Sequence, residues 1–517
     1  MSITTGRKNF GLLCRPHHRR PIWAITPASW IFLGVEIWRH GAHGIHRVSS
    51  PAEKVFTVWA LLEILFSIYH LIVVAQLSRK TSNIVLTSVD NVRRLYSRIL
   101  HLGLHNAPAN GALSRIPSHV PPSQLSMEDV PLLDRSDPRA VDFRQSLRSW
   151  FRNSPWSTLT RAHVSTWISW TIFNASVDTL SLEQKGVVSH AIDVIERRAG
   201  SKLPLEANDP TSAHIRPLLL TLDPMSIHCR PAIMYATINF VSFVCQEWYQ
   251  WRFGAHHEQY GDLEYTTSIH FVTTAIPGKD NAPILFLHGL GIGITQYHLV
   301  ITELLSNPAF NSRAIVIVIQ PHITQSLFHP RHLSPLNREK TVRDLRGLIL
   351  KTLNNNKASA PKTESCRPYG SVPHAWLLKA YPELLERSCF VDPVVFCLWE
   401  GDVCYNFVYK APTNAIEVLS RYLVGSELGI ANTIQRNFDW SANTLFLEEI
   451  PNALDPSRTM FFLGGKDAIV ASDRVRRYLI AHGVTMKGLR YDEKRCTRGA
   501  LEVGGSALAS IIAWLEK

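Results

Sequence analysis

Paired cysteines are missing from this sequence. Its 517 residues include eight Cys, at positions 14, 229, 245, 366, 389, 397, 404 and 496, with no CxxC and no other paired spacing. This absence argues against a disulfide framework and against a zinc ribbon, because both need cysteines in pairs. We therefore expect ordinary reduced thiols facing the cytosol.

Motifs for binding nucleotides and metals are missing as well. The sequence has no GxxxxGK[ST], no GxGxxG after an expected strand, and no zinc-ligand spacing. His256 and His257 stand beside Glu258, but no second cluster accompanies them, so a surface position is favoured over a metal site. We expect neither a cofactor nor a metal.

Charged residues are sparse. They make up 19% of the chain against 45% hydrophobic residues, which is typical of globular or membrane proteins and not of disordered ones. The net charge is nevertheless +12, and basic chains often bind nucleic acid or anionic membranes. Because Arg and Lys are scattered and crowd near apolar segments, the pattern favours a lipid bilayer as partner over nucleic acid.

Two apolar runs lie near the N-terminus. The run 55–77 is broken only by Glu63 and His70, and it reaches the roughly 20 residues that cross a bilayer; the run 21–38 is borderline. Basic residues precede the first run and follow the second, which predicts a hairpin with both ends cytosolic. We expect residues 1–80 to anchor the chain in an endomembrane, with the rest on its cytosolic side. The alternative is a buried helical hairpin in a soluble domain.

The middle of the chain is predicted to be a linker followed by helices. Pro-, Ser- and Asn-rich sequence predicts a linker within 81–140. In the helical region 141–260, Ser181 and Gln184 form a capping box that opens a helix ending near Gly200.

The run 231–251 within this region is apolar and rich in aromatic residues. It fits a helix that lies flat on a membrane, with Trp248, Tyr249 and Trp251 at the interface. It fits a buried helix at least as well.

The pattern changes at about residue 261. From there to the C-terminus short apolar runs alternate with helical stretches, which predicts an α/β domain with a mainly parallel sheet and helices on both faces. The strands at 268–274 and 284–287 are expected to form an antiparallel hairpin. Further strands are expected at 314–319, 390–399, 459–463 and 488–491, and helices at 339–353 and 506–515.

A glycine-rich loop, His288-Gly289-Leu290-Gly291, follows the apolar run 284–287. Glycines in such a loop let backbone N–H groups turn toward an oxygen that gains negative charge in acyl transfer. A simple turn after any α/β strand has a similar composition, so the downstream motifs decide between the two interpretations.

Four motifs together resemble the α/β-hydrolase superfamily, and most closely its membrane-associated fungal group. They are the HGLG loop, Tyr369-Gly370-Ser371 with the helix after it, Asp392-Pro393, and Gly464-Gly465-Lys466-Asp467. The resemblance covers residues 265–517 approximately. It implies an α/β-hydrolase fold at 261–517, esterase or lipase ancestry, and an ester or lipid ligand. It also implies an oxyanion hole at His288, Gly289, Leu290 and Gly291, a triad acid at Asp467, and a lid insertion at about 400–457.

The nucleophile position departs from the family pattern. Aligned on Tyr369-Gly370-Ser371, the G-x-S-x-G elbow becomes Cys366-Arg367-Pro368-Tyr369-Gly370, so Pro368 stands where the nucleophilic serine belongs. An elbow nucleophile needs a strained backbone at positive φ, whereas proline is locked near a φ of about −65°. The elbow therefore cannot form around Pro368.

The segment before the elbow is also unusual. Residues 354–366 are polar and include Pro361, which predicts an irregular segment where the family has a central strand. Loss of a strand and an elbow together suggests replacement of a whole segment, as at a wrongly predicted splice junction.

The triad base is missing too. The base belongs after the last strand, but no His follows His482, which precedes that strand. Arg498 lies near the expected position and cannot act as a general base, because arginine stays protonated. Asp467 has an alternative role as a helix cap. Cys366 as a substitute nucleophile has no His partner within reach in the sequence.

Two functions fit these patterns. The first is a membrane-associated α/β-hydrolase-fold protein of esterase or lipase lineage whose triad is incomplete, in effect a pseudoenzyme. The second is a non-catalytic binding or scaffolding protein that kept the fold and the lid.

Overall fold

The structure is a computed structural model that describes residues 20–40, 50–80, 89–104, 125–205, 214–268, 282–311, 313–355, 363–366, 371–493 and 506–516. The chain divides into two compact units. The first unit comprises Met1–Arg79 and Ile227–Phe240, and the second comprises Lys80–Ser226 and Val241–Lys517.

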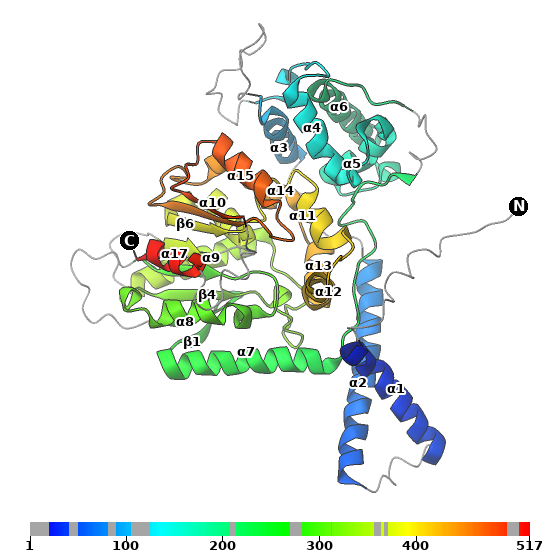
Figure 1. The fold of residues 1–517 in the computed structure, drawn as a ribbon, viewed down its shortest axis with the longest axis vertical. Coiled ribbons are helices and arrows are strands. Elements are labelled where there is room, and N and C mark those ends of the chain that lie inside the picture. The colour runs from blue at the N-terminus through cyan, green and yellow to red at the C-terminus, as the bar shows by residue number, and fades with distance from the viewer. Residues whose placement is uncertain are drawn as a thin grey trace, which may run out of the picture. The chain divides into compact units, whose positions relative to one another are not determined.

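The first unit is built on two N-terminal helices, α1 (Arg20–His40) and α2 (Pro51–Arg79), so both apolar runs are helical (Figure 1). They pack against each other, since Trp30 Nε1 donates to Ser67 Oγ at 3.1 Å and the rings of Phe32 and Phe56 meet edge to face. Of the described helices, α2 is the one long and apolar enough to cross a membrane.

The second unit contains a sheet whose described strands follow the order β1-β2-β4-β3-β5-β6-β7-β8. The first strands are antiparallel to their neighbours (β1 with β2, β2 with β4), and all pairings from β4 to β8 are parallel. The strands are β1 (His256–Tyr260), β2 (Leu263–Ser268), β3 (Ile284–Leu287), β4 (Ile315–Ile319), β5 (Thr363–Cys366), β6 (Leu385–Val391), β7 (Thr459–Gly464) and β8 (Leu489–Asp492). The expected mainly parallel sheet is therefore present.

Helices cover both faces of this sheet (Figure 1). Because strand side chains alternate between faces, Leu285 and Leu287 join one apolar cluster while Ile284 and Phe286 join another. The first cluster includes side chains from α9 (Arg338–Asn355), α10 (Ser371–Ala380) and α15 (Ser472–Ala481). The second includes side chains from α7 (Ala232–Phe253), α8 (His298–Ser306) and α17 (Ser506–Leu515).

A third apolar cluster joins two helical segments that are far apart in the sequence. The N-terminal segment comprises α3 (Val89–His101), α4 (Pro138–Arg148), α5 (Arg161–Phe173) and α6 (Leu182–Ala199). The other is the insertion between β6 and β7, with α11 (Asp402–Cys404), α12 (Ala415–Ser420), α13 (Leu428–Arg436) and α14 (Trp440–Asn443). We call the two segments together the cap. Helix α6 begins at the Ser181–Gln184 capping box and ends at Gly200 with φ 60°, as predicted.

Helix α3 corrects the prediction of a linker throughout 81–140. Its residues Val92, Leu95, Tyr96 and Leu100 share one face and are buried in the cap. The Pro- and Ser-rich stretch that suggested a linker falls mainly at 105–124, outside the described residues.

The predicted hairpin of strands 268–274 and 284–287 is wrong. Strand β2 ends at Ser268 and forms its hairpin with β1, where Gly261 turns the chain with φ 58°, while β3 pairs in parallel with β4 and β5. Residues 269–281 lie outside the described part of the chain.

Strand β6 also differs from its prediction. It runs from Leu385 to Val391 and ends eight residues before the predicted strand 390–399 does.

The prediction that residues 354–366 lack a central strand is also wrong. Strand β5 lies between β3 and β6 and pairs in parallel with both. Side-chain polarity was a poor guide because backbone groups form the ladder, and a gap here would leave the N–H and C=O groups of β3 and β6 unpaired. Pro361 lies outside the described residues. The hypothesis that a whole segment was replaced relied on the loss of both the strand and the elbow. Because the strand is present, that hypothesis now rests on the elbow alone.

Candidate functional site

The HGLG loop follows β3 at the carboxyl end of the parallel strands, the edge at which open α/β sheets bind ligands. His288 is fully buried, and burial lowers its pKa to about 4, so the imidazole is neutral. Its Nε2 accepts the backbone N–H of Gln320 at 2.9 Å, and the Gln320 side chain donates to the carbonyl of His288 at 2.9 Å. The side chain and the carbonyl of His288 thus hold the loop against Gln320.

A second hydrogen bond holds the other end of the loop. The N–H of Gly291 donates to the carbonyl of Ile323 at 3.0 Å. The segments 288–291 and 320–323 are therefore bonded at both ends, and this places Leu290 beside His322.

The backbone N–H groups of the loop differ in their hydrogen-bond partners. Gly289 donates to the Tyr297 hydroxyl at 3.0 Å, and Gly291 is committed to Ile323. The N–H of Leu290 has no hydrogen-bond partner among the described residues, and Leu290 lines a cavity. Of the N–H groups of Gly289, Leu290 and Gly291, that of Leu290 is therefore the one left to donate to a ligand.

The cavity has a volume of about 160 Å³ and is mainly apolar. The carboxyl ends of β3 and β4 contribute Leu287, Leu290 and Val318, α10 contributes Val372 and Trp376, and the cap contributes Phe407, Ile434 and Trp440. An apolar pocket with a few polar groups is typical of a small-molecule site.

His322 is a polar side chain of the cavity lining that the sequence patterns did not single out. It lines the cavity, and its ring has no hydrogen-bond partner among the residues described. Burial lowers its pKa to about 3, helped by the nearby His288 and His332. A neutral imidazole both donates and accepts, so His322 can bond a carbonyl or hydroxyl group.

The elbow position falls between β5 and α10. Pro368, Tyr369 and Gly370 lie outside the described residues. Ser371 begins α10, is fully buried, and has a hydroxyl without a partner in the described part of the chain. It does not line the cavity.

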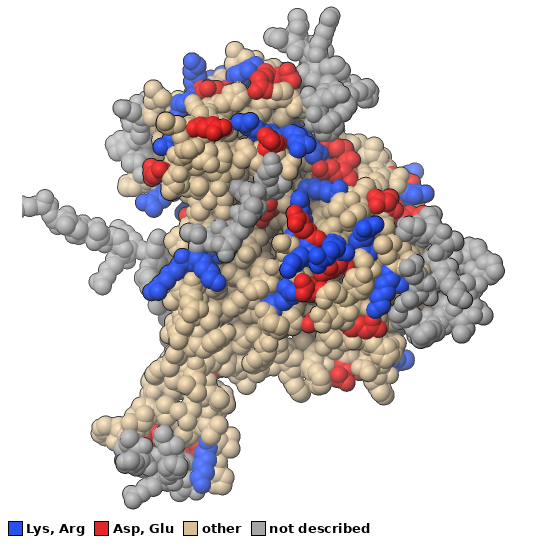
Figure 2. All heavy atoms as spheres, turned by 180° about the vertical axis from the view of Figure 1, so that it is seen from behind, with Lys and Arg blue, Asp and Glu red and all other residues tan. Residues whose placement is uncertain are grey.

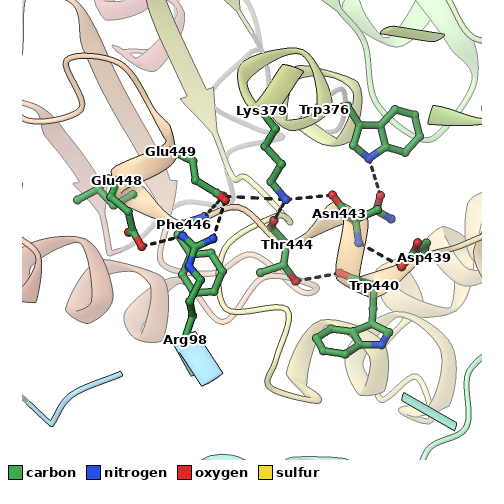
Figure 3. A network of polar contacts seen from close by, with 12 residues as sticks. Arg98, Trp376, Lys379, Asp439, Trp440, Asn443, Thr444, Phe446, Glu448 and Glu449 are labelled. Carbon is green, nitrogen blue, oxygen red and sulfur yellow. Dashed lines mark hydrogen bonds and ion pairs between the residues drawn. The ribbon is translucent and has the colours of Figure 1, made fainter. Parts of the chain in front are cut away.

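Helix α10 is tied to the cap by a polar network (Figure 3). Trp376 Nε1 donates to Asn443 Oδ1 at 2.9 Å, and Lys379 Nζ donates to the carbonyls of Ala442 and Thr444. The network continues to α3, where Arg98 forms ion pairs with Glu448 and Glu449 at 2.7 and 2.8 Å. Trp376 and Asn443 are the members of this network that line the cavity.

Asp467 lies after β7, as the resemblance requires. Its Oδ1 accepts the backbone N–H groups of Ile469 and Val470, each at 2.8 Å, which is a local turn ahead of α15. Asp392 follows β6 and accepts the N–H of Gly464 at 2.8 Å, which ties the ends of β6 and β7 together. The position expected for the triad base, including Arg498, lies outside the described residues.

No group of three or more His, Cys, Asp or Glu side chains could hold a metal ion among the residues described. His256 and His257 are exposed on strand β1, where His257 Nε2 lies 3.8 Å from Glu264 Oε2.

No protein-family model matches this sequence, and no curated protein matches it. Solved structures of α/β-hydrolase fold are similar to about half of the chain. They include carboxylesterase CesB from Bacillus subtilis, with 11% identity and a TM-score of 0.33, covering 55% of this chain and 97% of that one. A membrane phospholipase A, a bacterial virulence factor, has 13% identity and a TM-score of 0.34, covering 55% of this chain and 92% of that one. Epoxide hydrolase VrEH1 from Vigna radiata has 12% identity and a TM-score of 0.33, covering 51% of this chain and 97% of that one.

Proposed function

We propose that this protein binds an apolar carbonyl compound, an ester or a lipid, in the cavity under its cap and does not hydrolyse it through a serine triad. The observation that carries this proposal is the uncommitted N–H of Leu290 beside His322 on the wall of an apolar cavity. The carbonyl oxygen would accept from Leu290 or His322, and the hydrocarbon part would be buried against the apolar lining.

The proposed loss of catalysis rests on the sequence. Acyl transfer needs a nucleophile, a base that takes its proton, and oxyanion donors. Pro368 replaces the nucleophile, and no His follows position 482, so the donors alone are retained.

Binding of 2-octanone, compared with octane, tests the proposal. The ketone cannot be hydrolysed, and the alkane fills the same space without a carbonyl. Tryptophan fluorescence of the purified full chain reports binding, because Trp150, Trp170, Trp376 and Trp440 line the cavity. Because the ketone gives up the hydration of its carbonyl on binding, each affinity is compared with the partition of the same compound from water into hexadecane. We expect the ketone to bind, relative to octane, about 5- to 10-fold more tightly than the two partition coefficients predict, the value of roughly one hydrogen bond. His322→Leu should reduce this gain, and Val372→Phe should weaken both ligands by filling the cavity. A ratio of affinities equal to the ratio of partition coefficients in the unmodified protein would contradict the proposal.

We also propose that the chain is anchored in a membrane by α1 and α2, with the α/β unit on the cytosolic side. Support comes from the length and apolar composition of α2 and from the basic residues at both ends of the helix pair. The protein should stay in the membrane pellet after a carbonate wash, and protease added outside intact microsomes should digest the α/β unit. Recovery in the supernatant, or protection of the unit from protease, would contradict this.

Membership of the α/β-hydrolase superfamily, and of its membrane-associated fungal group, is part of the same proposal. The order of strands and the places of the HGLG loop after β3, the elbow position after β5 and Asp467 after β7 support the superfamily. Only the sequence motifs support the fungal group.

A further inference from the structure

A second cavity lies within the second unit, between the N-terminal segment of the cap and helix α15. Its volume is about 210 Å³, and residues of α3, α4, α5, α6 and α15 line it. Much of the lining is aromatic and buried, as with Trp150, Trp167 and Tyr478. Arg477 and Ala481 also line the cavity but are exposed, so it opens to solvent along α15. A cavity of this kind can bury the hydrocarbon part of a ligand.

This second cavity is distinct from the one beside the HGLG loop. The two cavities share three lining residues, Trp150, Glu400 and Trp440. Leu290 and His322 line the first cavity and do not line the second. A ligand in the second cavity would therefore not touch the groups that we propose bind a carbonyl.

Arg198 of α6 is buried in the wall of the second cavity. Its Nε and Nη2 donate to the carbonyls of Leu100 and Leu102, each at 3.0 Å, and its Nη1 donates to the carbonyl of Arg139 at 2.9 Å. Its Cζ lies 5.1 Å from the ring centroid of Phe143. Because Leu100, Leu102 and Phe143 all line the cavity, the guanidinium lies among lining residues.

The charge of Arg198 has no carboxylate partner. Its three acceptors are neutral carbonyls, and it forms no ion pair with a described residue. Asp137 and Asp142 act on it only from a distance, and they form ion pairs with Arg139 and Arg474 instead. Burial lowers the pKa of Arg198 to about 10, so the guanidinium is still protonated at neutral pH.

Capping of α3 explains only part of this arrangement. The carbonyls of Leu100 and Leu102 lie at the C-terminal end of α3, and such an end carries about half of one negative charge. A guanidinium has five N–H groups, so two groups of Arg198 are left without an acceptor among the described residues. Surface cations differ, because Figure 2 shows Asp and Glu side chains among the Lys and Arg side chains of the face in view. A buried cation is costly unless a counter-charge accompanies it.

The other charged residues of the lining leave one positive charge in excess. Arg474 donates to both Asp142 and Glu400 at 2.8 Å, so these two carboxylates share one cation. Arg477 at the mouth supplies a second cation, and Arg198 supplies a third. Three arginines are thus set against two carboxylates, which favours a ligand with a single negative charge.

We propose that the second cavity binds an amphiphilic monocarboxylate, such as a medium-chain fatty acid, with its carboxylate on Arg198 and its chain against the aromatic lining. The two remaining N–H groups of the guanidinium suit the two oxygens of a carboxylate. The single charge of the ligand balances the excess charge of the lining, and burial of the chain adds a hydrophobic contribution.

Competition for photolabelling tests this proposal in the unmodified full chain. The protein, in phosphatidylcholine vesicles, is labelled with a fatty acid that carries a diazirine in its chain. Mass spectrometry then measures the labelling of α4 and α15, which line the second cavity and not the first. The competitors are octanoate and octylamine, which have chains of equal length and opposite charge, and their free concentrations are measured.

We expect octanoate to displace the label at a free concentration about 10-fold lower than octylamine does, the value of roughly one hydrogen bond to a charged group. Equal or better competition by octylamine would overturn the proposal, and so would the absence of labelling on α4 and α15. This comparison needs no variant, so it does not depend on whether a substitution at Arg198 folds.

Variants locate the charge that is responsible. Arg198→Met should remove the preference for octanoate, and Arg198→Lys should retain part of it because the charge is kept. Arg197→Met is the matched control, since Arg197 is the adjacent residue of α6 and does not line the cavity. Val372→Phe, which fills the first cavity, should also keep the preference, and this separates the two sites. Variants are compared where their thermal unfolding matches the unmodified protein, and an unchanged preference in Arg198→Met would overturn the proposal.

Discussion

The indole of Trp376 donates a hydrogen bond of 2.9 Å to Asn443, and both side chains line the cavity. Trp376 belongs to α10, the helix that follows the elbow position, and Asn443 ends α14 in the insertion. The insertion is therefore joined to the ligand-binding edge of the sheet through a wall of the cavity itself (Figure 3). A ligand that enters must be accommodated by α10 and the cap together.

Removing this hydrogen bond should weaken both the fold and ligand binding. In Asn443→Ala the indole N–H loses its acceptor, which costs about 1–3 kcal/mol of the free energy of unfolding. Affinity for 2-octanone should fall because the wall is no longer fixed. Trp376→Phe combined with Asn443→Ala removes the donor as well and should recover part of the loss in stability, because no buried polar group is left unpaired. Chemical denaturation and fluorescence titration measure the two effects, and equal stability of Asn443→Ala and the unmodified protein would contradict the role assigned to this bond.

His374 should make the protein less stable in acid. It is fully buried, its ring stacks on Phe390, and its Nε2 lies 3.1 Å from Ser388 Oγ. Burial lowers its pKa from 6.5 to about 3. Between these values the unfolded chain binds the proton and the folded chain does not, so stability is present above pH 6.5 and is lost as the pH falls.

The variant His374→Phe isolates this effect, because it cannot bind the proton and keeps all other histidines. Unfolding is measured for both proteins at about pH 7 and about pH 5. The unmodified protein should lose about 2 kcal/mol more than the variant over this interval. An equal loss in the two proteins would show that His374 is not the group responsible.

Arg474 joins the cap to the α/β core through two carboxylates. It donates from Nε to Glu400 at 2.8 and 3.0 Å, and from both Nη atoms to Asp142 of α4 at 2.8 and 3.0 Å. Glu400 is buried, and burial raises its pKa in spite of the neighbouring guanidinium. No sequence motif predicted this cluster.

Arg474→Met should destabilise the protein by about 3–5 kcal/mol, because it leaves the Glu400 carboxylate buried without its partner. The double variant Arg474→Met with Glu400→Met removes both charges and should recover most of that loss. Denaturant unfolding of the two single variants and the double variant measures the coupling. Additive losses would mean that the pair does not act as a unit.

Much of the fold follows from patterns visible in the sequence. The runs at β4 and β7 are apolar throughout, because these strands are buried on both faces of a parallel sheet. Helix α17 occupies the predicted residues, and α9 exceeds its prediction by one residue at one end and two at the other. Strand β5 and the β1–β2 hairpin were missed because they are polar, and pairing of their backbones with neighbours outweighs the preference of their side chains.

The site was predicted in part. The HGLG motif located the loop, but the separate roles of His288, Gly289 and Leu290 depend on contacts with Tyr297 and Gln320 that no spacing reveals. His322 carries no motif. The one signal for it was its place just after the apolar run of β4, since parallel strands end at the same edge of a sheet.

Labelling with a fluorophosphonate tests whether the chain holds a working serine triad, because this reagent reports an activated serine whatever its position in the sequence. The full chain in vesicles is treated with the reagent, and labelled serine is quantified by mass spectrometry in the unmodified protein and in Pro368→Ser. We predict no stoichiometric labelling of either protein, because the base is absent as well as the nucleophile. Stoichiometric labelling of one serine in the unmodified chain would contradict the account and would identify the true nucleophile.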